Sequence, residues 1–82
     1  MSGLRSARRL NHLAGILNAT AAYAEAAELH ASALAIQESL LGRAHPELIG
    51  TLNAIADIRM TMGDKTGAGQ ILERALGIAE EA

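Results

Sequence analysis

The chain has no cysteine, no tryptophan and no phenylalanine, and Tyr23 is its single tyrosine. Without cysteine, neither a disulfide framework nor a thiolate metal site can form. Half of the 82 residues are apolar, so a core without large aromatic rings has to be built from alanine, leucine, isoleucine and methionine. Helices that meet through such small side chains pack with their axes close together.

An excess of charge and long apolar runs are lacking as well. The formal net charge is −2, and the basic cluster of Arg5, Arg8 and Arg9 is too small to be typical of nucleic-acid binding. No uncharged apolar run reaches the length of a membrane span, and the first residues lack the apolar stretch of a signal peptide. We therefore expect a cytoplasmic protein that binds neither nucleic acid nor membrane.

The sequence does contain a copy of itself, displaced by 42 residues. Leu10-Asn11 corresponds to Leu52-Asn53, and Ala33-Leu34 corresponds to Ala75-Leu76, with no insertion or deletion between them. A fixed period of this length, in residues that favour helices, is typical of stacked helix–turn–helix repeats. Such units bury their apolar faces against each other, which indicates an interaction surface rather than a catalyst.

The apolar spacing predicts four helices, over residues 4–19, 23–41, about 46–62 and about 65–82. We expect one all-α domain over residues 1–82, a fragment of an α-solenoid whose two stacked repeats span about 8–49 and 50–82. The buried stripe of the first helix is predicted to consist of Leu10, Leu13, Ala14 and Leu17. One face of the second helix is predicted to carry Ala26, His30, Ala33 and Gln37.

These residues resemble a tetratricopeptide repeat of the kinesin-light-chain-like branch. The connector of that branch is similar to Leu41-Gly42-Arg43-Ala44-His45-Pro46 followed by Leu52-Asn53. The small residues of the family correspond to Ala14, Ala26, Ala33, Ala56, Ala68 and Ala75. The resemblance covers about residues 8–82. The chain departs from it at the family's aromatic positions, which hold Leu17, His30, Arg59 and Leu72 here.

The resemblance implies a non-catalytic module that binds a peptide or a partner protein on the concave face formed by the first helix of each repeat. The residues that map onto this face are Arg8, Asn11, Asn18, Asn53, Asp57 and Met60. An asparagine amide offers both a donor and an acceptor to a peptide backbone. The alternative is that Asn11 and Asn53 brace adjacent helices.

No catalytic motif or cofactor site stands out, and His12 with His30 is a weak signal for zinc because no third ligand accompanies the pair. His45 is expected to cap the third helix. A second reading of the function is an assembly element whose role is its own oligomerisation, as a homodimer or a larger species. About three repeats are normally needed for stability, so we expect self-association through Ile71, Leu72 and Ile78.

The first turn leaves two structures open. The second repeat reverses direction at Gly63-Asp64, but the first repeat has Ala21-Ala22 at the same place. Alanine is disfavoured at positive φ and is the best residue inside a helix. The first repeat is therefore predicted to be either an ordinary helical hairpin or one continuous helix from about 4 to 41 in a domain-swapped dimer.

Overall fold

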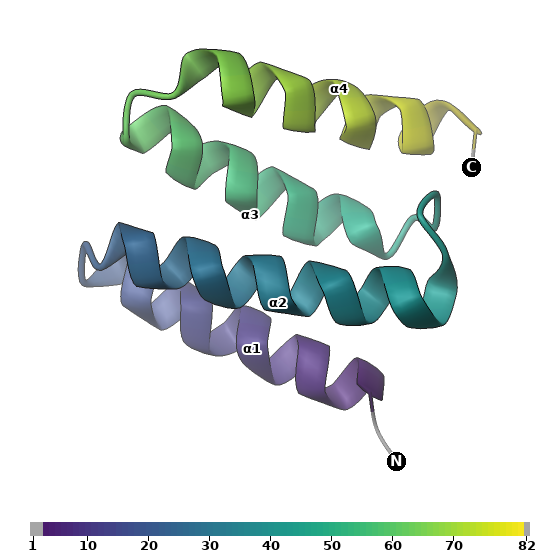
Figure 1. Cartoon of the computed structure of the whole chain (residues 1–82), viewed down its shortest axis with the longest axis horizontal. Helices are drawn as coiled ribbons and strands as arrows, with labels where there is room; N and C mark the ends of the chain where they lie inside the picture. Colours follow the sequence, from purple (N-terminus) through teal and green to yellow (C-terminus); the bar gives the residue numbers. More distant parts are fainter. Residues whose placement is uncertain (1–2, 82) are drawn as a thin grey trace.

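The computed structural model describes residues 3–81, so the predicted domain limits at residues 1–2 and 82 lie outside it. The described chain folds into α1 (Gly3–Ala19), α2 (Tyr23–Leu41), α3 (Leu48–Thr61) and α4 (Lys65–Glu81). Each helix runs antiparallel to the one before it, and α1 and α4 are the two outer helices of the stack (Figure 1). The predicted all-α fold of two stacked helix pairs is confirmed. The Cα atoms extend over 29 × 29 × 14 Å, so the stack is a flat slab.

The third helix begins two residues later than predicted. Pro46 and Glu47 form a turn in which the Leu48 N–H donates to the His45 carbonyl and the Ile49 N–H donates to the Pro46 carbonyl, both at 3.0 Å. These are bonds over three residues, typical of a tight turn at a helix start. The Nδ1 atom of His45 accepts a hydrogen bond from the Glu47 N–H at 3.0 Å and so closes the turn before α3, while Glu47 at the N-cap position makes no side-chain cap.

Both repeats turn through a residue at positive φ. Gly63 has φ of 91°, and Ala21, its counterpart 42 residues earlier, has φ of 66°. The second turn also has Asp64, whose Oδ1 accepts the Gly67 N–H at 2.9 Å, whereas Ala22 makes no side-chain cap at the start of α2. The first repeat is therefore the ordinary hairpin in this single chain, and the swapped dimer stays a prediction.

The core joins the two repeats through small and branched side chains. In one cluster Leu48, Leu52, Ala75 and Ile78 are buried together, and Leu34 of α2 packs against them. The predicted face of α2 is confirmed, because its buried residues are the four that the spacing selects.

In the second cluster, Ile58 of α3 is buried with Ala14 and Ala26 of the first repeat. The predicted stripe of α1 is wrong at one position. Leu13 is 47% exposed, and the buried residues of α1 are Ala7 and Ala14. Leu13 is left exposed because α1 is an outer helix (Figure 1).

Candidate functional site

A chain of side-chain hydrogen bonds connects three helices. The His30 Nδ1 atom lies 2.7 Å from the Asn11 Oδ1 atom, and the Asn11 Nδ2 atom donates to the Thr51 hydroxyl at 2.8 Å. That hydroxyl donates to the Gln37 Oε1 atom at 2.7 Å. The chain thus leaves α2 at His30, crosses α1 and α3, and returns to α2 at Gln37. It holds the first repeat against the second.

Every link of this chain has a fixed direction. Because the Asn11 amide nitrogen donates to Thr51, its oxygen accepts, and the His30 Nδ1 atom must carry the proton. Burial lowers the pKa of His30 below its ordinary value, because desolvation disfavours the charged imidazole. Neutral His30 supplies the single donor that Asn11 needs. His30, Gln37 and Thr51 are buried, so the interior carries polar groups that satisfy one another.

Both ends of the Asn11 amide are therefore engaged, one by His30 and the other by Thr51. Asn11 thus braces adjacent helices, which is the alternative to the peptide-binding role expected from the sequence. Its counterpart Asn53 is exposed on α3. Arg8 is exposed, and its guanidinium lies 3.5 Å from the Glu47 carboxylate just before α3. Three further predicted residues are also exposed: Asn18, Asp57 and Met60. We call the surface formed by Asn18, Asn53, Asp57 and Met60 the A-helix face.

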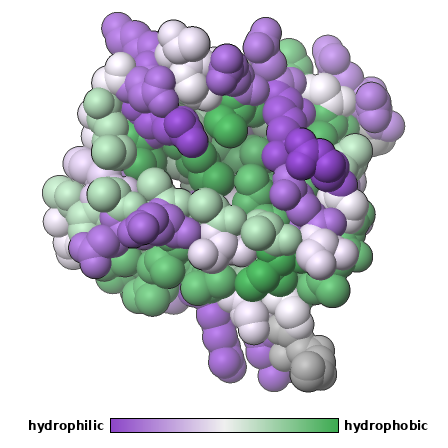
Figure 2. Space-filling model, in the orientation of Figure 1, coloured by the Kyte–Doolittle hydropathy of each residue, from purple (hydrophilic) through white to green (hydrophobic). Residues whose placement is uncertain are grey.

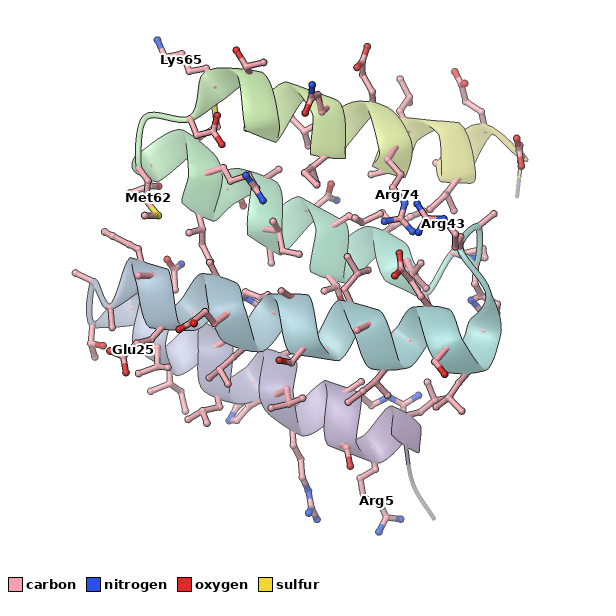
Figure 3. All side chains as sticks on the ribbon, viewed as in Figure 1. Arg5, Glu25, Arg43, Met62, Lys65 and Arg74 are labelled. Atoms are coloured by element: carbon pink, nitrogen blue, oxygen red, sulfur yellow. The ribbon has the colours of Figure 1, made fainter. Side chains whose placement is uncertain are left out.

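A charged contact joins the end of α2 to the middle of α4. Arg74 on α4 pairs with Glu38 on α2 and also donates to the Arg43 carbonyl at 3.1 Å. The Arg43 guanidinium lies 3.5 Å from the same Glu38 carboxylate, and the two arginines point toward one another in Figure 3. This contact binds the second helix of one repeat to the second helix of the next.

An apolar groove of about 450 Å³ runs between α2 and α4, with α3 as its floor. It is visible as a hollow lined in green in Figure 2. The groove exists because α2 contributes the small residues Ala27 and Ala31 to its wall. At one end Arg59 turns to Asp64, at 3.0 Å, rather than filling the hollow. The pKa of Asp64 is held below its ordinary value, mainly by the hydrogen bond from the Gly67 N–H and next by the hydrogen bond from Arg59.

The residues expected to drive self-association lie in three different environments. Ile78 is buried in the core of the chain, and half-buried Ile71 lines the groove. Leu72 is exposed, as is its neighbour Leu76 one turn later, at 44% and 59%. Leu76 therefore takes the place of Ile78 in any surface formed by α4.

Within residues 3–81, no three histidine, cysteine or acidic side chains come together in a way that could hold a metal ion. His12 is exposed on α1, whereas His30 is buried in the hydrogen-bonded chain. None of the helices described is long and apolar enough to cross a membrane.

Sequence reasoning missed the role of Thr51. The signal is its position inside the apolar stripe of α3, three residues after Leu48 and four before Ile55, all of which are buried. A polar residue in a buried stripe needs a buried partner, and Gln37 on the buried face of α2 is the polar residue that supplies it. The groove was also missed, because periodicity does not report how well side chains fill the space between helices.

Comparison with known proteins agrees with the geometry. A family model described as tetratricopeptide repeat matches residues 5–81. The match is to the repeat as such, and the kinesin-light-chain-like branch stays a prediction. No curated protein matches the chain.

Proposed function

Because the chain belongs to the tetratricopeptide repeat family, whose members generally mediate protein–protein interactions, we propose that it binds an extended peptide segment of a partner protein on the A-helix face. The observation that carries this proposal is the exposure of Asn53, Asp57 and Met60 along α3. They recur at spacings of four and three residues and so occupy one side of the helix. The proposed role is non-catalytic.

The chemistry of these side chains favours one class of peptide as the proposed ligand. Asn53 offers a donor and an acceptor for the main chain of a peptide. Asp57 offers a carboxylate for a lysine or arginine, and Met60 offers a flexible apolar surface that adapts to many side chains. The ligand that fits is an extended peptide with one basic residue close to one apolar residue.

Asn11 is separated from this role by its contacts. An amide that already donates to Thr51 and accepts from His30 has little left for a ligand. We assign Asn11 to the joint between repeats and Asn53 to the ligand. The two asparagines occupy the same place in the repeat, but the counterpart of His30 is Leu72, which cannot donate a hydrogen bond to Asn53.

The test uses peptides selected against the wild-type chain from a phage library of random sequences. One selected peptide, made synthetically, is titrated against the wild type and against the double variant Asn53→Ala/Asp57→Ala. We expect at least about a tenfold loss of affinity, the usual scale for losing a hydrogen bond and a charge contact. The control is Ala24→Glu/Ala35→Glu, which alters exposed residues of α2 outside this face.

Two results contradict the proposal. One is a selected peptide that binds the double variant and the wild type equally well. The other is a loss of helicity in the double variant, measured by circular dichroism, because that would make Asn53 and Asp57 structural residues.

A further inference from the structure

The joint between the two repeats is made by residues that enter the neighbouring repeat. Leu34 on α2 packs against the buried cluster of α3 and α4. In the opposite direction, Ile58 on α3 is buried with Ala14 and Ala26 of the first repeat. Ile55 on α3 lines the groove together with Leu34. These three side chains belong to the apolar part of the joint, which also includes Leu48 and Leu52.

The 42-residue period gives each of these side chains a counterpart at an outer helix. Leu34 corresponds to Leu76 on α4, which is exposed. Ile55 and Ile58 correspond to Leu13 and Ile16 on α1, which are 47% and 50% exposed. These three joint residues thus recur as exposed apolar side chains on the two outer helices.

The charges on the two outer helices are complementary in the same register. Arg9 and Arg5 lie one and two turns before Leu13, respectively, and Arg5 projects outward from the start of α1 in Figure 3. Glu80 lies one turn after Leu76, and Glu81 follows it at the end of α4. Because α2 runs antiparallel to α3 (Figure 1), a copy placed on α4 in the same way brings the first half of its α1, which carries Arg5 and Arg9, to the end of α4, which carries Glu80 and Glu81.

Three of these charges, those of Arg5, Glu80 and Glu81, are poorly placed in an isolated chain. A helix N-terminus carries a partial positive charge and a C-terminus a partial negative charge, so arginines near the start and glutamates at the end are disfavoured. In a stack of two chains, each set of charges meets the opposite set. Complementary charges of this kind select the partner and its register.

We propose that chains of this protein stack head to tail, with the outer face of α4 in one copy packing on the outer face of α1 in the next. The α4 face consists of Leu72, Leu76, Glu80 and Glu81, and the α1 face consists of Arg5, Arg9, Leu13 and Ile16. The contact repeats the α2–α3 joint between separate chains. It joins two different surfaces, so it leaves a free surface at each end and extends into longer species.

The test uses two variants that each block one face. In the α1-blocked variant, Leu13→Glu and Ile16→Glu place charges on the first face. In the α4-blocked variant, Leu72→Glu and Leu76→Glu do the same on the second. All four side chains are about half exposed in the single chain, so both variants are expected to fold, as circular dichroism will check.

Sedimentation velocity then measures size, for each variant alone and for the two mixed in equal amounts, from about 10 µM to about 1 mM, the range of weak association. The wild type is expected to grow beyond a dimer as concentration rises. Each blocked variant alone is expected to be monomeric, with association at least about 30-fold weaker, because a buried charge replaces an apolar contact. The mixture is expected to stop at a one-to-one dimer, since each variant retains the face that the other lacks.

The control is the exposed pair Ala24→Glu/Ala35→Glu on α2, which adds the same charge elsewhere and is expected to associate as the wild type does. A blocked variant that dimerises alone would overturn the proposal in favour of a symmetric contact through its remaining face. A wild type that stays monomeric would overturn it outright, as would a mixture of the two variants that stays monomeric. Peptide binding on the A-helix face is measured separately, so either proposal can fail without the other.

Discussion

The substitution Ala21→Gly is expected to stabilise the chain. Ala21 has φ of 66°, in the left-handed region, whereas its counterpart in the second repeat is a glycine with φ of 91°. The left-handed conformation costs a residue with a Cβ atom about 1–2 kcal/mol. Glycine removes this cost but gives the unfolded chain about 0.4–1 kcal/mol of additional conformational entropy. We therefore expect the free energy of unfolding to rise by about 0.5–1 kcal/mol.

The mirror substitution Gly63→Ala isolates the same cost in the second repeat. A Cβ atom added at Gly63 meets no other atom within 4 Å, so the effect comes from φ alone. We expect Gly63→Ala to lower the free energy of unfolding by about 0.5–1 kcal/mol, for the balance of strain and entropy described above. The two variants should therefore shift stability by similar amounts in opposite directions.

Thermal and urea denaturation followed by circular dichroism measures both effects. For a chain of this length the rise for Ala21→Gly corresponds to about 2–8 °C in Tm. The control is Ala35→Gly, which lies exposed inside α2 and should lower stability by about 1 kcal/mol. If Ala21→Gly lowers stability as Ala35→Gly does, then residue 21 is helical in solution and the hairpin assigned to the first repeat is refuted.

Three further predictions concern the first turn and the polar chain. Ala22→Asp should raise the urea midpoint by supplying the cap that α2 lacks, which is a gain of about 1 kcal/mol in the free energy of unfolding. Combining Ala21→Gly with Ala22→Asp should reduce the amount of any swapped dimer measured by sedimentation. Asn11→Ala should cost about 1–3 kcal/mol in urea denaturation, because it leaves the buried His30 Nδ1–H without an acceptor and the Thr51 hydroxyl without the donor that Asn11 supplies. Asn53→Ala should stay within about 0.5 kcal/mol. Because burial lowers the pKa of His30 from 6.5, the unfolded chain takes up a proton more readily than the folded chain, so stability should fall as the pH drops below 6.5. Urea titrations at several pH values should show a weaker decline for His30→Gln.

The fold could be predicted from the sequence because its local signals agree with one another. The limits of α2 at Tyr23 and Leu41 follow from apolar spacing and from Gly42, which has φ of 90°. The four residues expected on one face of α2 are the buried ones. The start of α3 was placed two residues early, because proline suits both a first helical turn and the tight turn that Pro46 forms.

The site was harder to predict, because equivalence between repeats gives the position of a residue on its helix but does not tell which neighbouring helix, if any, packs over it. Asn11 and Asn53 are equivalent, yet one is held by Thr51 and His30 and the other is exposed. Leu13 and Ile55 are equivalent as well. Ile55 is buried because α2 lies beside α3, whereas Leu13 is exposed because α1 is an outer helix. A period identifies such pairs, and the difference within each pair appears only when the helices are placed in space.

The central claim is that the residues that join the two repeats inside the chain also join separate chains. Light scattering of the wild type over a concentration series tests it most directly, because head-to-tail stacking has no fixed end point. We predict an average mass that rises past that of two chains as the concentration increases. A mass that stays at that of one chain at every concentration would contradict the claim.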